Sequence, residues 1–141
     1  MTASNKITGV VFTDIGQGAS FMALEWVQRA IREKVGFAPH PGTLNLRLES
    51  VEAKQSWKEL KESHEGIDVP PAETSFCHAR CYLARFTQSP RSDKDDGTVA
   101  VLVPEVDSYP EDKLEVIAPY HVKDTLKVKD GDHLTLEFVG K

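Results

Sequence analysis

Cysteine is scarce in this 141-residue sequence, and no stretch approaches the roughly 18 apolar residues of a membrane-spanning helix. The two cysteines, Cys77 and Cys81, would lie about 13 Å apart in an extended strand, which is too far for a disulfide. We therefore interpret both as reduced thiols. The sequence starts without an apolar run typical of a signal peptide, so we expect a cytoplasmic protein with no membrane partner.

The sequence also has no excess of positive charge. It contains 17 Lys and Arg and 22 Asp and Glu, which gives a net charge of −5. Nucleic acids are bound largely through phosphate neutralisation, so we expect no nucleic-acid partner. A zinc site built on Cys77, His78 and Cys81 would lack a fourth ligand, and the other histidines show no metal-type spacing. Length and the 40% hydrophobic content predict one globular domain over residues 1–141, by default a monomer.

The first predicted strand covers residues 7–13 and is rich in β-branched side chains. It leads into glycines, after which apolar residues at three- and four-residue intervals predict a helix over 19–35. Ser20 is the expected cap of this helix and Gly36 its expected end.

The rest of the chain predicts short strands, with a polar segment at 50–73 that we expect to form a short helix and loop on a barrel rim, anchored by Trp57 and Leu60. No alternating series of strands and helices is present. We therefore predict a mainly β fold, a closed six-stranded β-barrel with one main helix after the first strand. The further strands are expected at 43–48, 75–86, 98–104 and 114–119, and after a turn at Asp130-Gly131.

Two short motifs suggest chemistry at the ends of strands. The glycines between Asp14 and Ser20 permit a nest of backbone N–H groups around an anion, or simply a tight turn. Thr43 and Asn45 lie two apart on an extended segment, so their side-chain oxygens share one face. Such oxygens suit Mg²⁺, although they could instead satisfy backbone groups of the turn and strand.

A third stretch carries Glu115, which could accept a hydrogen bond from a ligand hydroxyl or act as a general base. Lys123 could meet a phosphate, or form a solvated ion pair with the neighbouring Asp124. His121 and His133 are expected to be surface or satisfied residues, because no nucleophile partner lies near either in sequence.

Two blocks of this sequence resemble the archaeal-type CTP-dependent riboflavin kinase family. The block GFAPHPGTLNL at 36–46 is similar to that family's GF-x-P-x-PGTLN signature. The blocks LEVIAP at 114–119 and LKVKDGD at 126–132 are similar to its closing strands. Together they extend the resemblance over most of the chain, from Gly9 to Phe138.

The resemblance implies a cradle-loop β-barrel enzyme that transfers the γ-phosphoryl group of CTP to the ribityl hydroxyl of riboflavin, giving FMN and CDP. It implies Mg²⁺ as cofactor, held by Thr43 and Asn45, and Glu115 as a flavin-binding and catalytic residue. On the flavin side it also implicates Asp107. The implied nucleotide-binding residues are Ile15, Gly16, Gln17, Gly18, Ala19, Ser20, Tyr120, His121, Val122 and Lys123.

Several residues depart from the family pattern, among them Asp14 in place of a glycine, Gln17 in place of an acid, and Asp107-Ser-Tyr109 in place of a Thr-x-His pattern. They leave open a non-catalytic flavin- or nucleotide-binding module on the same barrel, or a kinase for another small molecule. A domain that serves only protein interaction is a weaker alternative.

Overall fold

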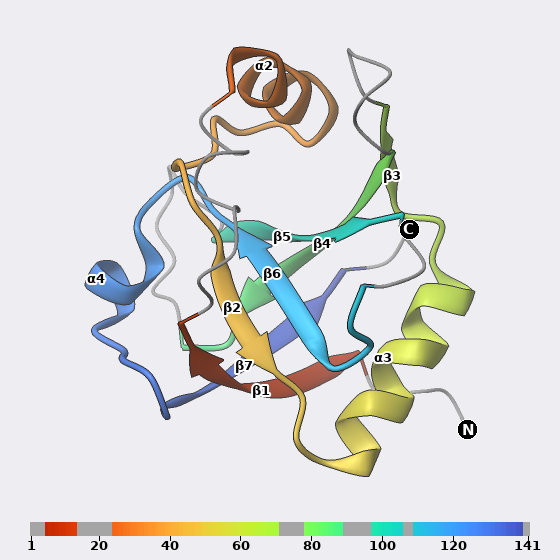
Figure 1. Cartoon of the computed structure of the whole chain (residues 1–141), viewed down its shortest axis with the longest axis vertical. Coiled ribbons are helices and arrows are strands. Elements are labelled where there is room, and N and C mark those ends of the chain that lie inside the picture. The colour runs from red at the N-terminus through yellow and green to blue at the C-terminus, as the bar shows by residue number, and fades with distance from the viewer. Residues whose placement is uncertain (1–4, 14–23, 71–77, 89–96, 106–108, 140–141) are drawn as a thin grey trace.

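The strands form one antiparallel sheet that closes on itself (Figure 1). The computed structural model describes residues 5–13, 24–70, 78–88, 97–105 and 109–139. Its strands follow the order β3-β4-β5-β6-β2-β1-β7, and a further pairing of β4 with β7 closes six of them into a barrel. The strands are β1 Lys6–Phe12, β2 Leu44–Arg47, β3 Ile67–Val69, β4 Ala79–Phe86, β5 Thr98–Pro104, β6 Lys113–Ile117 and β7 His133–Phe138.

This arrangement confirms the predicted mainly β, six-stranded closed barrel. The additional strand β3 pairs with β4 on the side away from β5, and the sequence analysis missed it. It lies in the polar segment expected to be loop. With only three residues, it is too short for a period of two to stand out from its surroundings.

Alternation along β2 and β6 separates the barrel interior from its outer face. Leu44 and Leu46 on β2 and Val116 on β6 belong to the apolar cluster inside the barrel. Asn45 and Glu115 alternate with them and are opposite each other across the β2–β6 ladder, so both are directed to the outer face. This alternation brings polar side chains of two distant sequence blocks together.

Helix α2, which follows β1 in the described chain, covers Glu25–Lys34 and packs on the outer face of the barrel (Figure 1). The expectation that it would be the main helix and the rim helix a short one is wrong, because α2 has 10 residues and the rim helix α3 (Val51–Ser63) has 13. Val27 and Ile31 contribute the buried side of α2.

The predicted single helix over 19–35 is wrong in its start, because the N-cap of α2 is Leu24, which has an extended backbone. Ser20, the residue expected to cap it, lies outside the described residues. The apolar residues keep a helical spacing N-terminal to Leu24. Such spacing indicates which face of a helix is buried, but it does not indicate the first residue of the helix.

The predicted end of α2 is confirmed. Gly36 follows the last turn with a φ of +105°, and its N–H donates to the carbonyl of Ile31 at 3.2 Å. A left-handed residue at this position satisfies a free carbonyl of the last turn, and glycine adopts it at least cost.

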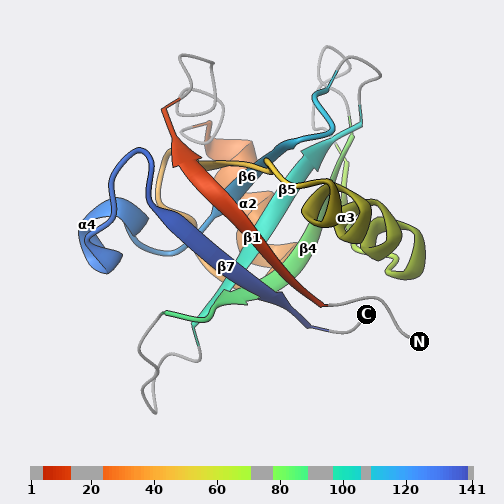
Figure 2. The same cartoon turned by 90° about the horizontal axis from the view of Figure 1, so that it is seen from below.

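The second helix, α3, covers Val51–Ser63, and the hydroxyl of Ser50 caps it by accepting from the N–H of Ala53 at 3.0 Å. The expectation that Trp57 and Leu60 anchor this segment is confirmed, since both are buried in the barrel cluster. A third helix, α4, covers Val122–Leu126 and was not predicted. Helices α3 and α4 lie on opposite sides of the barrel in both views (Figures 1 and 2).

Cys81 is fully buried in β4, and burial raises the pKa of its thiol to about 12. Cys77 lies outside the described residues. No helix in the described ranges has both the length and the apolar character needed to cross a membrane.

Candidate functional site

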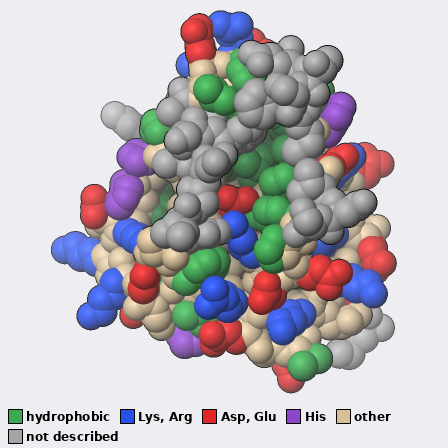
Figure 3. Space-filling view, in the orientation of Figure 1, with side chains coloured by type: hydrophobic (Ala, Val, Ile, Leu, Met, Phe, Trp, Pro, Cys, Tyr) green, Lys and Arg blue, Asp and Glu red, His purple; other side chains and the backbone are tan. Residues whose placement is uncertain are grey.

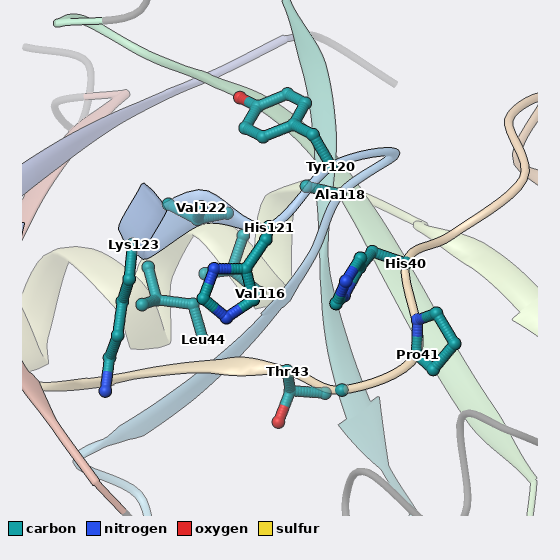
Figure 4. Close-up of a pocket in the computed structure, with 11 residues that line it drawn as sticks. His40, Pro41, Thr43, Leu44, Val116, Ala118, Tyr120, His121, Val122 and Lys123 are labelled. Carbon is teal, nitrogen blue, oxygen red and sulfur yellow. The ribbon is translucent and has the colours of Figure 1, made fainter. Parts of the chain in front are cut away.

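A pocket of about 270 Å³ lies where the chain entering β2 meets the chain leaving β6 (Figure 4). The N–H of His40 donates to the carbonyl of Ala118 at 2.7 Å and ties the two segments together. The pocket therefore joins two of the sequence blocks that suggested chemistry. Its lining is formed by His40, Pro41, Gly42, Thr43, Leu44, Val116, Ala118, Tyr120, His121, Val122 and Lys123.

Five of the predicted site residues thus lie on one pocket, namely Thr43, Tyr120, His121, Val122 and Lys123. The Lys123 side chain comes from α4 and the Thr43 side chain from the chain entering β2 (Figure 4). The Lys123 ammonium and the Thr43 hydroxyl point to the same side of the pocket in this view. A cation and a hydroxyl placed in this way suit an anionic ligand.

Thr43, Asn45 and Glu115 form a second group next to the pocket. The Thr43 hydroxyl donates to Oε1 of Glu115 at 3.4 Å, and Glu115 is the ladder partner of Asn45. Residues directly opposite in an antiparallel pair point to the same face, so the carboxylate and the amide are neighbours. Asn45 itself does not line the pocket.

The side-chain oxygen of Asn45 is unusual. The residue is 9% exposed, and its Oδ1 has no hydrogen-bond partner among the described residues. A buried acceptor without a partner costs roughly 1–3 kcal/mol, so such atoms are rare unless a ligand completes them. The alternative in which Oδ1 satisfies a backbone group does not hold within the described chain. A carbonyl oxygen of this kind is a suitable ligand for a hard cation.

Tyr109 is a site residue that the sequence analysis missed as a partner of Glu115. Its hydroxyl donates to Oε2 of Glu115 at 2.6 Å. Together with the contact from Thr43, this fixes the carboxylate between two side chains from different segments. Nothing in the acidic, proline-containing segment around Tyr109 signals such a contact, because it depends on how that segment folds back on β6.

Lys123 does not pair with Asp124, so that alternative is wrong. Its ammonium donates to Oγ1 of Thr13 and to Oδ1 of Asp130, each at 3.2 Å. Asp124 instead lies 3.1 Å from Nδ1 of His121, which also caps α4 by accepting from the N–H of Asp124. Hydrogen bonds from Thr13, followed by that from Lys123, hold the pKa of Asp130 below its usual range.

Two histidine rings meet at the pocket. His40 and His121 are edge to face, with ring centroids 5.2 Å apart (Figure 4). His121 was implied by the family resemblance, whereas His40 was quoted only as part of the signature and not as a site residue. His133 is exposed on β7, as expected for a surface histidine.

The remaining predicted site residues lie outside the described residues. They are Asp107 and the glycine-loop residues Ile15, Gly16, Gln17, Gly18, Ala19 and Ser20. In the part of the chain that the structure describes, no group of three or more His, Cys, Asp or Glu side chains could hold a metal ion.

The face seen in Figure 3 carries both hydrophobic and charged side chains. Hydrophobic side chains are visible in a hollow below α2, and positive and negative side chains are interspersed over the lower part of the face (Figure 3). Among the described residues on this view, charges of one sign are not gathered into a single broad patch.

Comparison with known proteins identifies relatives of the whole barrel. Proteins named riboflavin kinase are similar to this chain in Pyrobaculum calidifontis (38% identity, covering 96% of this chain), Archaeoglobus fulgidus (33%, covering 95%) and Methanococcoides burtonii (33%, covering 93%). The matched regions make up 60%, 54% and 56% of those proteins, so the chain spans little more than half of their length. Residues 11–138 match a family named for CTP-dependent riboflavin kinase and described as a domain of unknown function, DUF120. The chain therefore belongs to the CTP-dependent riboflavin kinase domain family.

Proposed function

We propose that this domain phosphorylates riboflavin, transferring the γ-phosphoryl group of CTP to the ribityl hydroxyl to give FMN and CDP with the assistance of Mg²⁺. Membership of the family and the names of the relatives support riboflavin and CTP as substrates. The observation that carries the proposal is the buried, unpartnered Oδ1 of Asn45 next to Thr43 and Glu115.

The donor set fits Mg²⁺. This ion prefers oxygen ligands, dehydrates reluctantly, and is often held by one or two protein oxygens together with substrate phosphates. Asn45 Oδ1 and Thr43 Oγ1 are the oxygens we propose to hold it, and the nearby Glu115 carboxylate adds negative charge. When bound, the ion would neutralise charge on the phosphoryl group during transfer.

The other residues would act by binding and orienting the substrates. The pocket between His40 and Lys123 would take the nucleotide, with the Lys123 ammonium facing its phosphates. We propose that Glu115 accepts the hydrogen bond of the ribityl hydroxyl at Oε1. Within the described residues that oxygen has only the long 3.4 Å contact with Thr43, whereas Oε2 accepts a short bond from Tyr109. Phosphoryl transfer depends mainly on such positioning and on charge neutralisation.

The test is FMN formation from riboflavin, CTP and Mg²⁺ by the purified protein and by Thr43→Ala and Asn45→Leu. Each substitution is expected to lower kcat/KM by about 100-fold or more, the scale found when one group that stabilises a transition state is removed. Asn45→Leu is expected to keep or raise the urea midpoint, because it replaces an unpaired buried acceptor with an apolar group of similar size. Loss of activity without loss of stability indicates a ligand-binding residue.

The matched control is Thr135→Ala, which removes a threonine hydroxyl from β7 that is bonded to Thr8 and lies outside the pocket. It should leave the rate of FMN formation unchanged. A folded wild-type protein that forms no FMN with any nucleoside triphosphate and Mg²⁺ would refute the proposal. Tight binding of both ligands without product would instead favour the non-catalytic binding module.

A further inference from the structure

We propose that Thr13 and Asp130 are positioning residues that hold the Lys123 ammonium toward the polyphosphate of the nucleotide. This inference rests on the proposed function, because it concerns the phosphate side of the same pocket. It begins with the place of Lys123, whose side chain lines the pocket while its ammonium is bonded to residues outside the lining (Figure 4). A lysine that lines a pocket while its ammonium is hydrogen-bonded to Thr13 and Asp130 has a restricted range of positions.

Among the described residues, the hydrogen bonds of the ammonium use two of its three donors. Nζ donates to Thr13 Oγ1 and Asp130 Oδ1, each at 3.2 Å. An ammonium group carries three N–H donors, so within this part of the chain one remains for a phosphate oxygen. The Lys123 side chain lines the pocket and is 34% exposed, so a ligand in the pocket can reach it. A free lysine has many rotamers to lose on binding, and restraint before binding reduces that entropic cost.

Thr13 links the two charged groups. Its hydroxyl hydrogen is shared between Oδ1 and Oδ2 of Asp130, at 2.9 and 2.8 Å, while its oxygen accepts from Lys123. The hydroxyl therefore fixes the orientation of the carboxylate and of the ammonium together. This makes the arrangement a three-membered cluster, more restrained than an isolated surface ion pair.

The backbone beneath the cluster is itself fixed. The turn containing Asp130 is bonded to β1, with Gly131 N–H donating to the carbonyl of Val11 and Val11 N–H donating to the carbonyl of Asp132, each at 2.8 Å. The side chain of Asp132 further closes the turn by accepting from the N–H of Lys129 at 2.9 Å. Thr13 follows β1 directly, so both partners of Lys123 come from backbone held by the same ladder.

Charge alone predicts the opposite effect from positioning, and this separates the two. Asp130 places a negative charge near the pocket, so removing it should strengthen the binding of a polyphosphate if only the local field mattered. If Asp130 acts by holding Lys123, removing it should weaken binding, and only while Lys123 is present. The sign of the change therefore distinguishes the two accounts.

The experiment measures the affinity for CTP with Mg²⁺, and separately for riboflavin, by calorimetry. The variants are Thr13→Val, Asp130→Asn and Lys123→Met, together with each of the first two combined with Lys123→Met. Thr13→Ser is the matched control, because it keeps the hydroxyl that bridges Lys123 and Asp130. Thermal unfolding of every variant establishes that it is folded.

We expect Thr13→Val and Asp130→Asn each to weaken CTP binding roughly two- to fivefold, the range for a partly exposed charged pair. Riboflavin affinity should be unchanged, Thr13→Ser should resemble wild type, and neither substitution should weaken CTP binding further in the Lys123→Met background. A second readout needs no ligand: the hydrogen-bonded Lys123 ammonium should give a ¹H–¹⁵N signal that is absent in Lys123→Met and lost in Thr13→Val.

The outcomes separate the inference from the proposed function. If the wild-type protein binds CTP and Lys123→Met weakens it, while Thr13→Val and Asp130→Asn match wild type, the positioning role is overturned and the proposed function stands. Tighter CTP binding in Asp130→Asn also overturns it. If the folded wild-type protein binds no CTP, the proposed function is refuted. The role of Thr13, Asp130 and Lys123 in nucleotide binding is then refuted as well.

Discussion

Single polar atoms distinguish the two ends of the site. The buried amide oxygen of Asn45 has no partner within the described chain, whereas the exposed carboxylate of Asp130 accepts from two donors, the Thr13 hydroxyl and the Lys123 ammonium. A buried acceptor lowers stability when it stays unpaired, and a bonded carboxylate raises stability while it remains ionised. Both groups lie beside residues that we assign to ligand binding. An amide does not titrate, whereas the pKa of the Asp130 carboxyl can be measured without a ligand and depends on its hydrogen bonds.

The Asp130 carboxylate gives a pH prediction. Its pKa in the folded protein lies below the ordinary 3.8, because Thr13 and then Lys123 donate to the charged form. Its stabilising contribution is therefore fully present above the unfolded pKa, and is lost as pH falls through the lower, folded value. We expect the unfolding midpoint of Asp130→Asn to be below that of wild type at pH 7, with the difference shrinking on acidification below 3.8.

Carboxyl-carbon NMR titration of the same residue checks the cause. Wild-type Asp130 should titrate below 3.8, and Thr13→Val should move its pKa upward, since the hydroxyl is the largest contributor to the shift. An unchanged titration in Thr13→Val would show that the hydroxyl bond does not form in solution.

Thr43 and Asn45 were singled out by residue type and spacing, and the 120–123 segment by the family resemblance; Thr43 and residues 120–123 lie on one pocket, and their binding roles stay predictions. Sequence reasoning could not find Thr13, Asp130 or Tyr109 as partners of site residues. The contacts of Thr13 and Asp130 join positions 117 residues apart, and a lysine has many acceptors available to it in a sequence. Proximity in sequence suggested Asp124 as the ion-pair partner of Lys123, whereas the turn after α4 brings Asp130 to the Lys123 ammonium.

At the scale of elements, α3 shows how a polar segment can still contribute to the core. Most of its residues are exposed or half-buried, but Trp57 reaches Tyr82 and Phe138, with ring centroids 5.5 Å away in both cases. One large aromatic side chain thereby anchors the helix on the barrel. The sequence predicted this anchor because large apolar residues are rare in the segment.

Trp57→Ala is expected to destabilise the protein by roughly 3–5 kcal/mol, because it removes a 2%-exposed aromatic side chain from between two others. The control is Val51→Ala on the same helix, where Val51 is 81% exposed. It should change the free energy of unfolding by at most about 0.5 kcal/mol. Chemical denaturation followed by circular dichroism measures both, and equal effects of the two substitutions would contradict the anchoring role.

Element boundaries were predicted less well than element types. The strands 98–104 and 133–138 and the end of α2 follow from β-branched runs and from glycine, which are strong local signals. The start of α2, the short β3 and the five-residue α4 carry weak signals. α4 is closed by Lys127 in a left-handed conformation, with a φ of 56°, where the usual glycine stop signal is absent.

For the molecule as a whole, closure is the main structural fact. β4 pairs with β5 on one side and with β7 on the other, so the six barrel strands form a ring. The seam buries Ala84, Phe86 and Phe138. In a closed barrel every strand contributes to one core. A barrel strand therefore cannot detach without breaking its pairing with two neighbouring strands.

We therefore expect the domain to unfold in one cooperative step. Tryptophan fluorescence and far-ultraviolet circular dichroism should give superimposable urea transitions, since Trp57 packs inside the cluster that the strands enclose and Trp26 on α2 packs against the outer cluster. Two separated transitions would mean that a helix and the barrel unfold as independent units.

The fold class could be predicted because many short strands without alternating helices favour a barrel, but the order β4-β5-β6-β2-β1-β7 could not. Strand order depends on contacts between distant segments, which a single sequence does not display. The residues alone suggested Thr43 and Lys123 separately, but not that they share a pocket, because that depends on the barrel bringing the two segments together.

The β1–β7 ladder also fixes where additional polypeptide can be attached. Lys6 at the start of β1 is paired with Glu137 near the end of β7, whereas Thr13 and Asp130 meet at the opposite end of the same ladder. A tag or second domain fused ahead of β1 and one fused behind β7 would both emerge at the Lys6–Glu137 end. A fusion attached before β1 or after β7 thus starts at the end of the ladder opposite Thr13 and Asp130, away from the Lys123 part of the pocket.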